Sequence, residues 1–203
     1  MQIFLHLNDL PEGLTFPQGV AVDTEAMGLR IGRDRLCLVQ LCGGDDACHL
    51  VRIASLPNPA PHLVRVLANP KVLKIFHFAR FDVPLLEKTF GISIYPFYCT
   101  KLASKIARTY TYQHGLKELC KSLLQIDLSK EEQTSDWGND TLSPEQQHYA
   151  ANDVLYLHAL KKKLDTILVR ERKSEIFQAG LRALSEIIQI EKAGFDVEGL
   201  FRH

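Results

Sequence analysis

GVAVDTE (residues 19–25) opens a series of three short apolar runs, which LCLVQLC (36–42) and ACHLVRI (47–53) complete. Each run is alternating or rich in β-branched residues, and GGDD (43–46) provides a turn between the last two. We therefore predict three strands that pair as an antiparallel meander. QIFLHL (2–7) has the same character and predicts one more strand before it.

The rest of the chain alternates between helix and strand. VLKIFHF (72–78) is typical of a buried strand, and Ser143-Pro144-Glu145-Gln146 carries the capping signals that begin a long helix. Further helical patterns cover residues 60–69, 81–90, 100–109, 115–124 and 174–192. This order predicts an α/β fold. We predict one domain, residues 1–172, followed by a helical C-terminal extension, residues 173–203, that packs on the domain or in an oligomer interface.

Composition excludes several classes of protein. The 203 residues carry 24 basic and 24 acidic side chains. This balance disfavours a protein that coats long nucleic acid, but it is compatible with a single active site for a short nucleic acid. No apolar window is long enough to span a membrane. Five scattered cysteines without a CxxC pair disfavour a disulfide framework and a structural zinc site. With no signal peptide at the start, we expect a cytoplasmic protein.

Four acidic residues stand in unusual positions. Asp23 and Glu25 end an apolar strand and point to the same face, Asp82 follows a buried strand, and Asp153 lies in the more apolar part of a helix. Taken singly, these positions also suit a solvated turn, a helix cap or an exposed side chain. Carboxylates about 4 Å apart repel by about 4 kcal/mol per pair at an effective dielectric near 20, so a cluster of all four needs cations. All-oxygen ligands favour Mg²⁺ or Mn²⁺ over zinc.

Tyr149 precedes Asp153 by one helical turn, so the two side chains share a helix face. A tyrosine hydroxyl with a pKa near 10 is neutral at physiological pH. Beside a metal site we therefore expect it to orient a water molecule rather than to act as a strong base. The alternative is core packing.

The motifs Asp23-Thr24-Glu25, Asp82 in FHFARFD, and Tyr149 with Asp153 resemble the three motifs of the DEDD 3′–5′ exonucleases. The Tyr-x-x-x-Asp spacing resembles the tyrosine subclass, which includes ribonuclease D. The similarity extends over roughly residues 17–165 and is greatest to the short nanoRNase C type, without the C-terminal helical domains of full ribonuclease D. It implies a ribonuclease H-like fold, in which a mixed sheet with three antiparallel strands is flanked by helices.

The resemblance also implies two-metal hydrolysis of a phosphodiester. Asp23 would bridge two divalent cations, Glu25 and Asp153 would hold the one that activates water, and Asp82 would help to hold the other. Tyr149 would align the water for attack on the 3′-terminal phosphodiester, and the product would be a 5′-mononucleotide.

Several residues near these motifs are candidates for substrate binding. By the same resemblance, Leu29 would wedge between two bases and Thr24 would meet the terminal sugar. His77 could bind a phosphate, and its alternative is a core histidine with satisfied hydrogen bonds.

A basic stripe lies in the chain between the second and third motifs. Lys101, Lys105 and Arg108 fall at i, i+4 and i+7 of a predicted helix, which places them on one face. We predict that Lys101 and Arg108 bind the anionic substrate, with a merely solvated helix face as the alternative.

The resemblance thus implies a 3′–5′ exoribonuclease that hydrolyses very short single-stranded RNA, including dinucleotides. The alternatives are ribonuclease D-like trimming of transfer RNA or other 3′ ends, a single-stranded DNA exonuclease, and a non-catalytic nucleic-acid-binding module. The presence of all four acids and the tyrosine disfavours the last of these. The resemblance further implies a homo-oligomer, up to an octamer of stacked rings.

Overall fold

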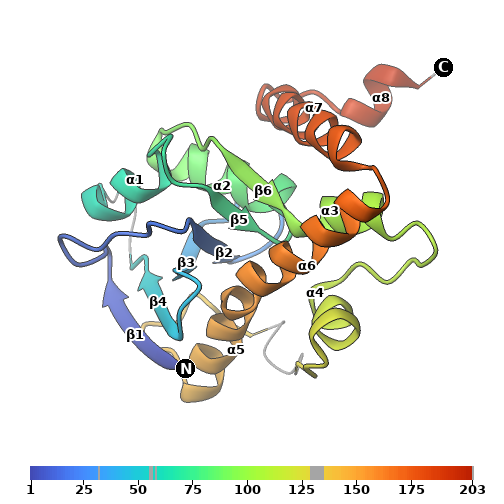
Figure 1. Ribbon diagram of the computed structural model, residues 1–203. Coiled ribbons are helices and arrows are strands. Elements are labelled where there is room, and N and C mark those ends of the chain that lie inside the picture. The colour runs from blue at the N-terminus through green and yellow to red at the C-terminus, as the bar shows by residue number, and fades with distance from the viewer. Residues whose placement is uncertain (32, 55–56, 58, 129–134, 203) are drawn as a thin grey trace.

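In the part of the chain that the structure describes, six strands form one mixed sheet (Figure 1). The computed structural model describes the whole chain apart from residues 32, 55–56, 58, 129–134 and 203. The strands are β1 (Gln2–Leu7), β2 (Val20–Ala26), β3 (Leu36–Cys42), β4 (Ala47–Arg52), β5 (Lys74–Phe76) and β6 (Phe97–Cys99). They lie in the order β1-β4-β3-β2-β5-β6.

The middle of the sheet is the predicted meander. β2 pairs antiparallel with β3, and β3 pairs antiparallel with β4. β1 joins one edge parallel to β4, while β5 and β6 extend the other edge as parallel strands. Every residue of β3 is buried, as expected for a central strand that is covered on both faces. The predicted mixed α/β sheet with an antiparallel meander is confirmed.

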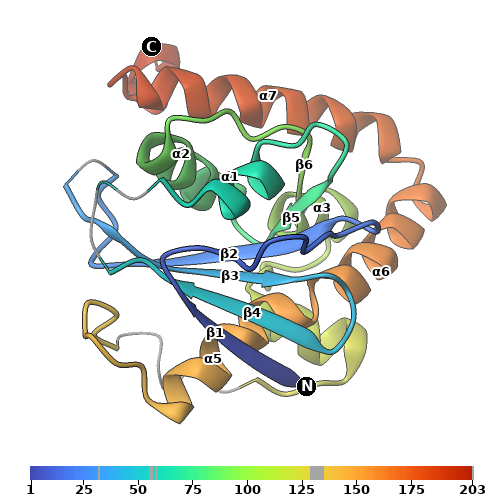
Figure 2. The same cartoon turned by 90° about the vertical axis from the view of Figure 1, so that its left-hand side faces the viewer.

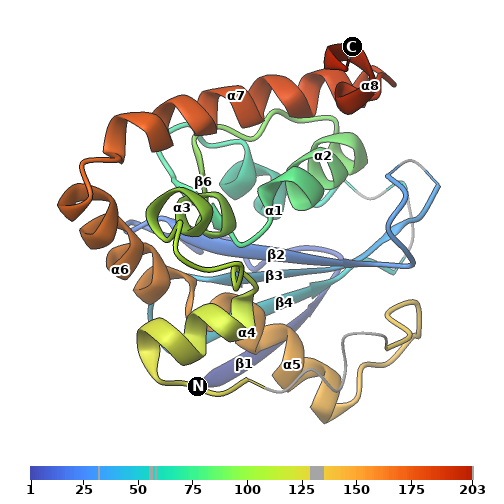
Figure 3. The same ribbon diagram turned by 90° about the vertical axis from the view of Figure 1, so that its right-hand side faces the viewer.

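Helices cover both faces of this sheet. They are α1 (Pro61–Leu67), α2 (Ala79–Phe90), α3 (Thr100–Ala107), α4 (Leu116–Leu119), the π-helix η1 (Cys120–Leu124), α5 (Pro144–Leu155), α6 (Leu157–Arg170), α7 (Ser174–Lys192) and α8 (Val197–Phe201). α1, α2 and α7 lie on one side of the sheet and α5 on the other (Figure 2, Figure 3). One apolar cluster joins the sheet to α1 and α2, and a second joins it to α3, α5 and α6. Among the described residues, no helix is long and apolar enough to cross a membrane.

The long helix predicted from Ser143 begins where expected but is divided in two. The Ser143 hydroxyl accepts a hydrogen bond from the Gln146 N–H at 3.2 Å, and the Gln146 side chain accepts one from the Ser143 N–H at 2.8 Å. α5 then ends at Leu155, and the chain bends at Tyr156 (φ −99°, ψ −3°) before α6. α5 packs against the strands of the sheet and α6 against α3. The prediction of a single long helix was therefore wrong. The apolar spacing continues from α5 into α6, but the two helices pack against different partners, and this difference divides them.

Short elements account for the other differences. β5 has three residues, fewer than the predicted run 72–78, and neither β6 nor α8 was predicted. The segment 115–124 is helical but changes from α to π geometry at Cys120. A strand of three residues is too short to show alternation, so its pairing with neighbours defines it rather than its own sequence.

The C-terminal helix α7 packs on the rest of the chain. Its apolar stripe buries Phe177 and Ile188, and the helix contacts α2, α3, α6 and β6. The Phe177 ring lies 4.9 Å from that of Tyr98, measured between centroids. Much of the stripe is therefore used inside this chain.

We expect Phe177→Ala to lower the free energy of unfolding by about 3 kcal/mol, because it leaves a cavity between α7 and the domain. Phe177 is 2% exposed. The neighbouring Ile176 is 61% exposed, so Ile176→Ala serves as a control that changes stability by less than about 0.5 kcal/mol. Urea denaturation measures both values, and equal small losses would contradict the packing of α7.

Candidate active site

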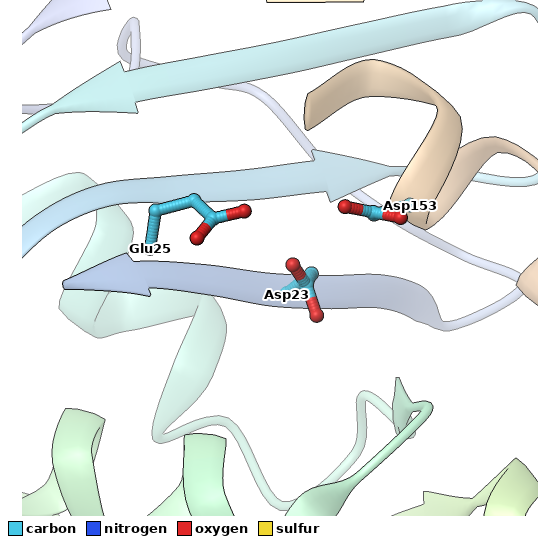
Figure 4. Close-up of side chains that lie close together, drawn as sticks. All are labelled: Asp23, Glu25 and Asp153. Carbon is cyan, nitrogen blue, oxygen red and sulfur yellow. The ribbon is translucent and has the colours of Figure 1, made fainter. Parts of the chain in front are cut away.

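Three carboxylates from two elements converge beside the sheet (Figure 4). Asp23 and Glu25 come from β2, where alternation points both toward the side that carries α5, and Asp153 comes from α5. One oxygen of each carboxylate lies within 4.8 Å of one oxygen of each of the other two. All three side chains are half-buried. The structure thus brings together residues 23, 25 and 153, as the sequence indicated.

Asp82 lies next to this group rather than within it. It sits in the first turn of α2 and is 3% exposed. The Thr24 hydroxyl donates a hydrogen bond of 2.6 Å to Oδ1 of Asp82. Thr24 therefore links β2 to α2. Its hydroxyl donates to the Asp82 carboxylate, whereas the resemblance implied a contact with the terminal sugar of the substrate.

Burial raises the pKa of all four acids, and repulsion between them adds to the shift at Asp23, Glu25 and Asp153. The pKa of Asp23 is well above its usual value, first because of burial and then because of the charges of Asp82, Asp153 and Glu25. Burial raises the pKa of Glu25 to about 9, with the Asp153 charge adding to the effect. Burial also raises the pKa of Asp153 to about 7, although a hydrogen bond from Tyr149 opposes the shift. The site is therefore unfavourable for negative charge unless a cation enters it.

Tyr149 lies on the same face of α5 as Asp153 and lines the same cavity. Burial raises its pKa, and the negative charges of Asp153, Glu25 and Asp23 raise it further. The phenol therefore stays neutral and has a proton to donate. Its ring packs at 6.1 Å from that of Trp137, centroid to centroid. Trp137 is itself 5% exposed, so it supports the tyrosine from within the core.

Gln40 is a residue that the sequence analysis missed. It stands directly across the ladder from Asp23, is fully buried, and donates a hydrogen bond from Nε2 to Oδ2 of Asp23 at 3.4 Å. The sequence feature that could have revealed Gln40 is that it is the one polar residue in LCLVQLC. An amide in a run buried on both faces needs a partner.

The carboxylates line a cavity of about 360 Å³ that also receives most of the predicted substrate residues. Thr24, Leu29, His77 and Lys101 line it, together with Phe78. Leu29 is 83% exposed at this cavity, and the Lys101 ammonium lies 4.3 Å from the centroid of the Phe78 ring. These residues surround one volume although they come from three separate parts of the chain.

Arg108 is placed differently. It is 4% exposed and does not line the cavity. Its guanidinium donates to the Gln113 carbonyl at 3.1 Å and to the Ser122 hydroxyl at 3.1 Å. The two members of the predicted basic stripe therefore differ. Lys101 lines the cavity, whereas Arg108 points into the protein and its hydrogen-bond donors bind other groups of the chain.

His77 is held by Thr100, whose hydroxyl lies 2.9 Å from its Nδ1. Nε2 is buried and has no described partner. Burial lowers the pKa of His77 to about 3, and the nearby charge of Lys101 contributes. The imidazole is therefore neutral and can act on a ligand through hydrogen bonding rather than through charge.

The donor set fits a divalent cation. The oxygens of the three carboxylates are close enough to bind one ion together, and burial raises the pKa of each group. A cation would therefore stabilise the ionised form of these oxygen ligands. All three ligands offer oxygen, which is the donor atom that hard divalent cations prefer.

The fold and the site together define a nuclease domain of the 3′–5′ exonuclease class. Residues 6–169 match the family model described as 3′–5′ exonuclease. The chain belongs to this family, and the predicted fold and ribonuclease D-like resemblance are confirmed. Helix α7 lies outside the matched region.

Similar proteins add detail. Ribonuclease D of Granulibacter bethesdensis is 34% identical over 152 residues, which are 75% of this chain and 38% of that protein. This chain spans about two fifths of the length of such curated relatives. A structure of Brucella melitensis NrnC bound to pGG is 42% identical with a TM-score of 0.93, and the match covers 100% of this chain and 99% of that one. Escherichia coli RNase D is 25% identical with a TM-score of 0.75, over 86% and 45% of the two chains.

The raised pKa values predict how the metal-free protein responds to pH. In a chelator, we expect the free energy of unfolding to fall as pH rises from about 5 to about 9, because the folded chain binds more protons than the unfolded chain in this window. Mg²⁺ should restore stability at the upper end, since it binds the deprotonated site. Calorimetry across pH, with and without Mg²⁺, measures both effects.

Glu25→Gln should raise metal-free stability near pH 8 and weaken the response to Mg²⁺. Glu12→Gln, at an exposed position, is the matched control and should change neither. A metal-free stability that stays constant across this pH range would show that the carboxylates do not repel one another as described.

Proposed function

We propose that this protein is a divalent-metal-dependent 3′–5′ exoribonuclease that hydrolyses very short single-stranded RNA, including dinucleotides, to 5′-mononucleotides in the cytoplasm. The observation that carries the proposal is the convergence of Asp23, Glu25 and Asp153 beside Tyr149 on one cavity. Membership of the 3′–5′ exonuclease family supports the reaction type.

The acidic residues have distinct parts in this proposal. Asp23 is central, because the charges of all three other acids act on its carboxylate, and it would help to hold both of two divalent ions. Glu25 and Asp153 would complete the site of one ion and Asp82 would contribute to the other. Such ions supply Lewis-acid stabilisation of the negative charge on the attacking and leaving oxygens. NrnC of Brucella melitensis has been solved with bound Mg²⁺, which supports the choice of metal.

Tyr149 positions the attacking water. Because its pKa is raised, the hydroxyl remains protonated and can donate a hydrogen bond, while its lone pairs accept one. Contact with Asp153 on one side and Trp137 on the other restricts the ring. A water fixed by such a hydroxyl is held for in-line attack without the need for a strong base.

The preference for very short RNA rests on the cavity and on likeness. About 360 Å³ of space accommodates part of a short oligonucleotide, with Leu29 exposed at it. The likeness to NrnC bound to pGG covers the whole of this chain, and identity is higher than to Escherichia coli RNase D, described as an exoribonuclease involved in structured RNA processing. This favours short substrates over trimming of structured RNA.

We also propose that copies of the chain associate, up to an octamer. Because Phe177 and Ile188 are buried within the chain, the C-terminal surface available for this purpose is different from the predicted stripe. Exposed apolar side chains near the C-terminus, at Phe195, Leu200 and Phe201, offer one such surface. The mass of the protein in solution tests this directly.

Time courses on 5′-labelled RNAs of two and about twenty nucleotides test the proposed function. We expect release of mononucleotides from the dinucleotide in Mg²⁺ and none in a chelator. Comparable rates on both lengths would contradict the preference for very short RNA, and a lack of cleavage of either would contradict the activity.

Asp153→Asn should reduce turnover of the dinucleotide more than about a hundredfold, because it removes a negatively charged oxygen from the metal site. Asp140→Asn is the control, since the Asp140 side chain is 101% exposed and should leave turnover unchanged. Circular dichroism of both variants confirms folding. Wild-type turnover in Asp153→Asn would refute the assignment of this residue to the metal.

Leu29→Ala should slow hydrolysis of the dinucleotide more than hydrolysis of longer RNA, because the wedge separates the two bases that a dinucleotide has. Leu7→Ala, on the edge strand β1 and 60% exposed in the wild type, is the matched control. The kcat/KM for each length is the measurement. An equal effect on both lengths would remove Leu29 from base recognition.

A further inference from the structure

Gln40 places a buried amide beside the central acid of the active site. It lies in the middle of β3, every residue of which is buried, and is itself 0% exposed. Its neighbours across the sheet are Asp23 on β2 and Leu50 on β4. Directly opposed residues of antiparallel strands point to the same face, so the amide lies between a carboxylate and an apolar side chain. Leu50 belongs to the apolar cluster that also includes Ala150 of α5.

The amide of Gln40 bonds Asp23 through its nitrogen, and its oxygen is left unpaired. Nε2 donates to Oδ2 of Asp23 at 3.4 Å, whereas Oε1 is buried and has no partner among the described residues. An amide can donate to a carboxylate only through its nitrogen, so the direction of the amide follows from the position of Asp23. The oxygen therefore points away from Asp23, where a buried acceptor without a partner is unfavourable.

Packing alone does not explain a glutamine at this position. Every other residue of LCLVQLC (36–42) is apolar. Leu38 and Cys42, the two neighbours on the same face of β3, are fully buried without an amide. An apolar side chain of similar volume would fill the same space and leave no unpaired acceptor. The bond to Asp23 is therefore what accounts for the amide.

This bond restrains the carboxylate of Asp23. Among the described residues, no other side chain donates a hydrogen bond to that carboxylate. The last torsion of an aspartate side chain has a broad distribution, so a donor at Oδ2 limits the rotation and sets the direction of Oδ1. A neutral amide holds the carboxylate in this way without adding a further charge to the site.

We propose that Gln40 is a positioning residue that fixes the rotation of the Asp23 carboxylate and thereby preorganises the active site for divalent cations. This inference rests on the proposed function. Among the described residues, the lining of the active-site cavity includes Asp23 but not Gln40, so Gln40 acts through Asp23 and does not touch the substrate. Hydrogen-bond partners of metal ligands typically contribute about 10- to 100-fold to metal affinity or activity.

Gln40→Met tests this inference, because methionine has a similar length and volume but no amide donor. We expect the Kd of Mn²⁺, measured by titration calorimetry without RNA, to rise about tenfold or more. At an Mn²⁺ concentration that saturates the wild type, kcat for the dinucleotide should fall, while KM for the dinucleotide stays within about twofold of the wild-type value.

A stability measurement separates this role from a merely structural one. In a chelator, we expect the urea midpoint of Gln40→Met to equal or exceed that of the wild type, because the substitution removes a buried acceptor without a partner. A structural role predicts the opposite, a lower midpoint with an unchanged Kd of Mn²⁺. Loss of the fold in Gln40→Met would therefore overturn the inference.

Leu41→Met is the matched control. Leu41 follows Gln40 in β3 and is also 0% exposed, but it points to the opposite face, into the apolar cluster that joins the sheet to α1 and α2. The control places the same side chain in the same strand, and a volume-conserving exchange of this kind is well tolerated. We expect both the Kd of Mn²⁺ and kcat to match those of the wild type.

An unchanged Kd of Mn²⁺ in Gln40→Met would overturn the inference. A rise in KM for the dinucleotide alone would also overturn it, since Gln40 would then act in substrate binding. If the wild type binds Mn²⁺ but cleaves neither the dinucleotide nor a longer RNA, the proposed function fails, and the two Kd values still decide the inference.

Discussion

The mutual repulsion of acidic side chains at one end of β2 is the constraint on which the rest of the structure depends. Asp23, Glu25 and Asp153 approach within 4.8 Å of one another, and burial removes the water that would screen them. Folding has to hold these groups in place against that repulsion. The core of the protein provides the stabilisation, and a divalent cation would relieve the repulsion.

Packing explains how the carboxylates stay together. Ala150 and Ala151 of α5 are fully buried, so small side chains let this helix approach the sheet closely enough for Asp153 to reach β2. Gln40 and Thr24 then each bond a carboxylate from a neighbouring position. The clustered carboxylates lower the stability of the protein locally but serve its function, and the apolar core around them offsets the loss.

The C-terminal helix belongs to the same system. Arg80, two residues before Asp82 on α2, pairs with Glu191 of α7. Glu87, further along α2, pairs with Lys192 and accepts a hydrogen bond from the Ile94 N–H at 2.8 Å. The helix that carries Asp82 is therefore bound on its outer side by a segment outside the family match.

Local spacing was enough to predict the meander and the start of α5, because alternation and helical period act over a few residues. It singled out Asp23, Glu25, Asp82, Tyr149 and Asp153 only one by one, and the resemblance to the DEDD exonucleases assigned them to one site. Local spacing was not enough for features set by distant partners. The bend at Tyr156 leaves the apolar period unbroken, and β6 exists only through pairing with β5. Helical period predicted Arg108 on the same helix face as Lys101, but α3 ends at Ala107 and the Arg108 side chain turns inward. That inward turn depends on Gln113 and Ser122, which the fold brings to it. Local chemistry thus sets which groups can react, while long-range packing sets which of them face the cavity.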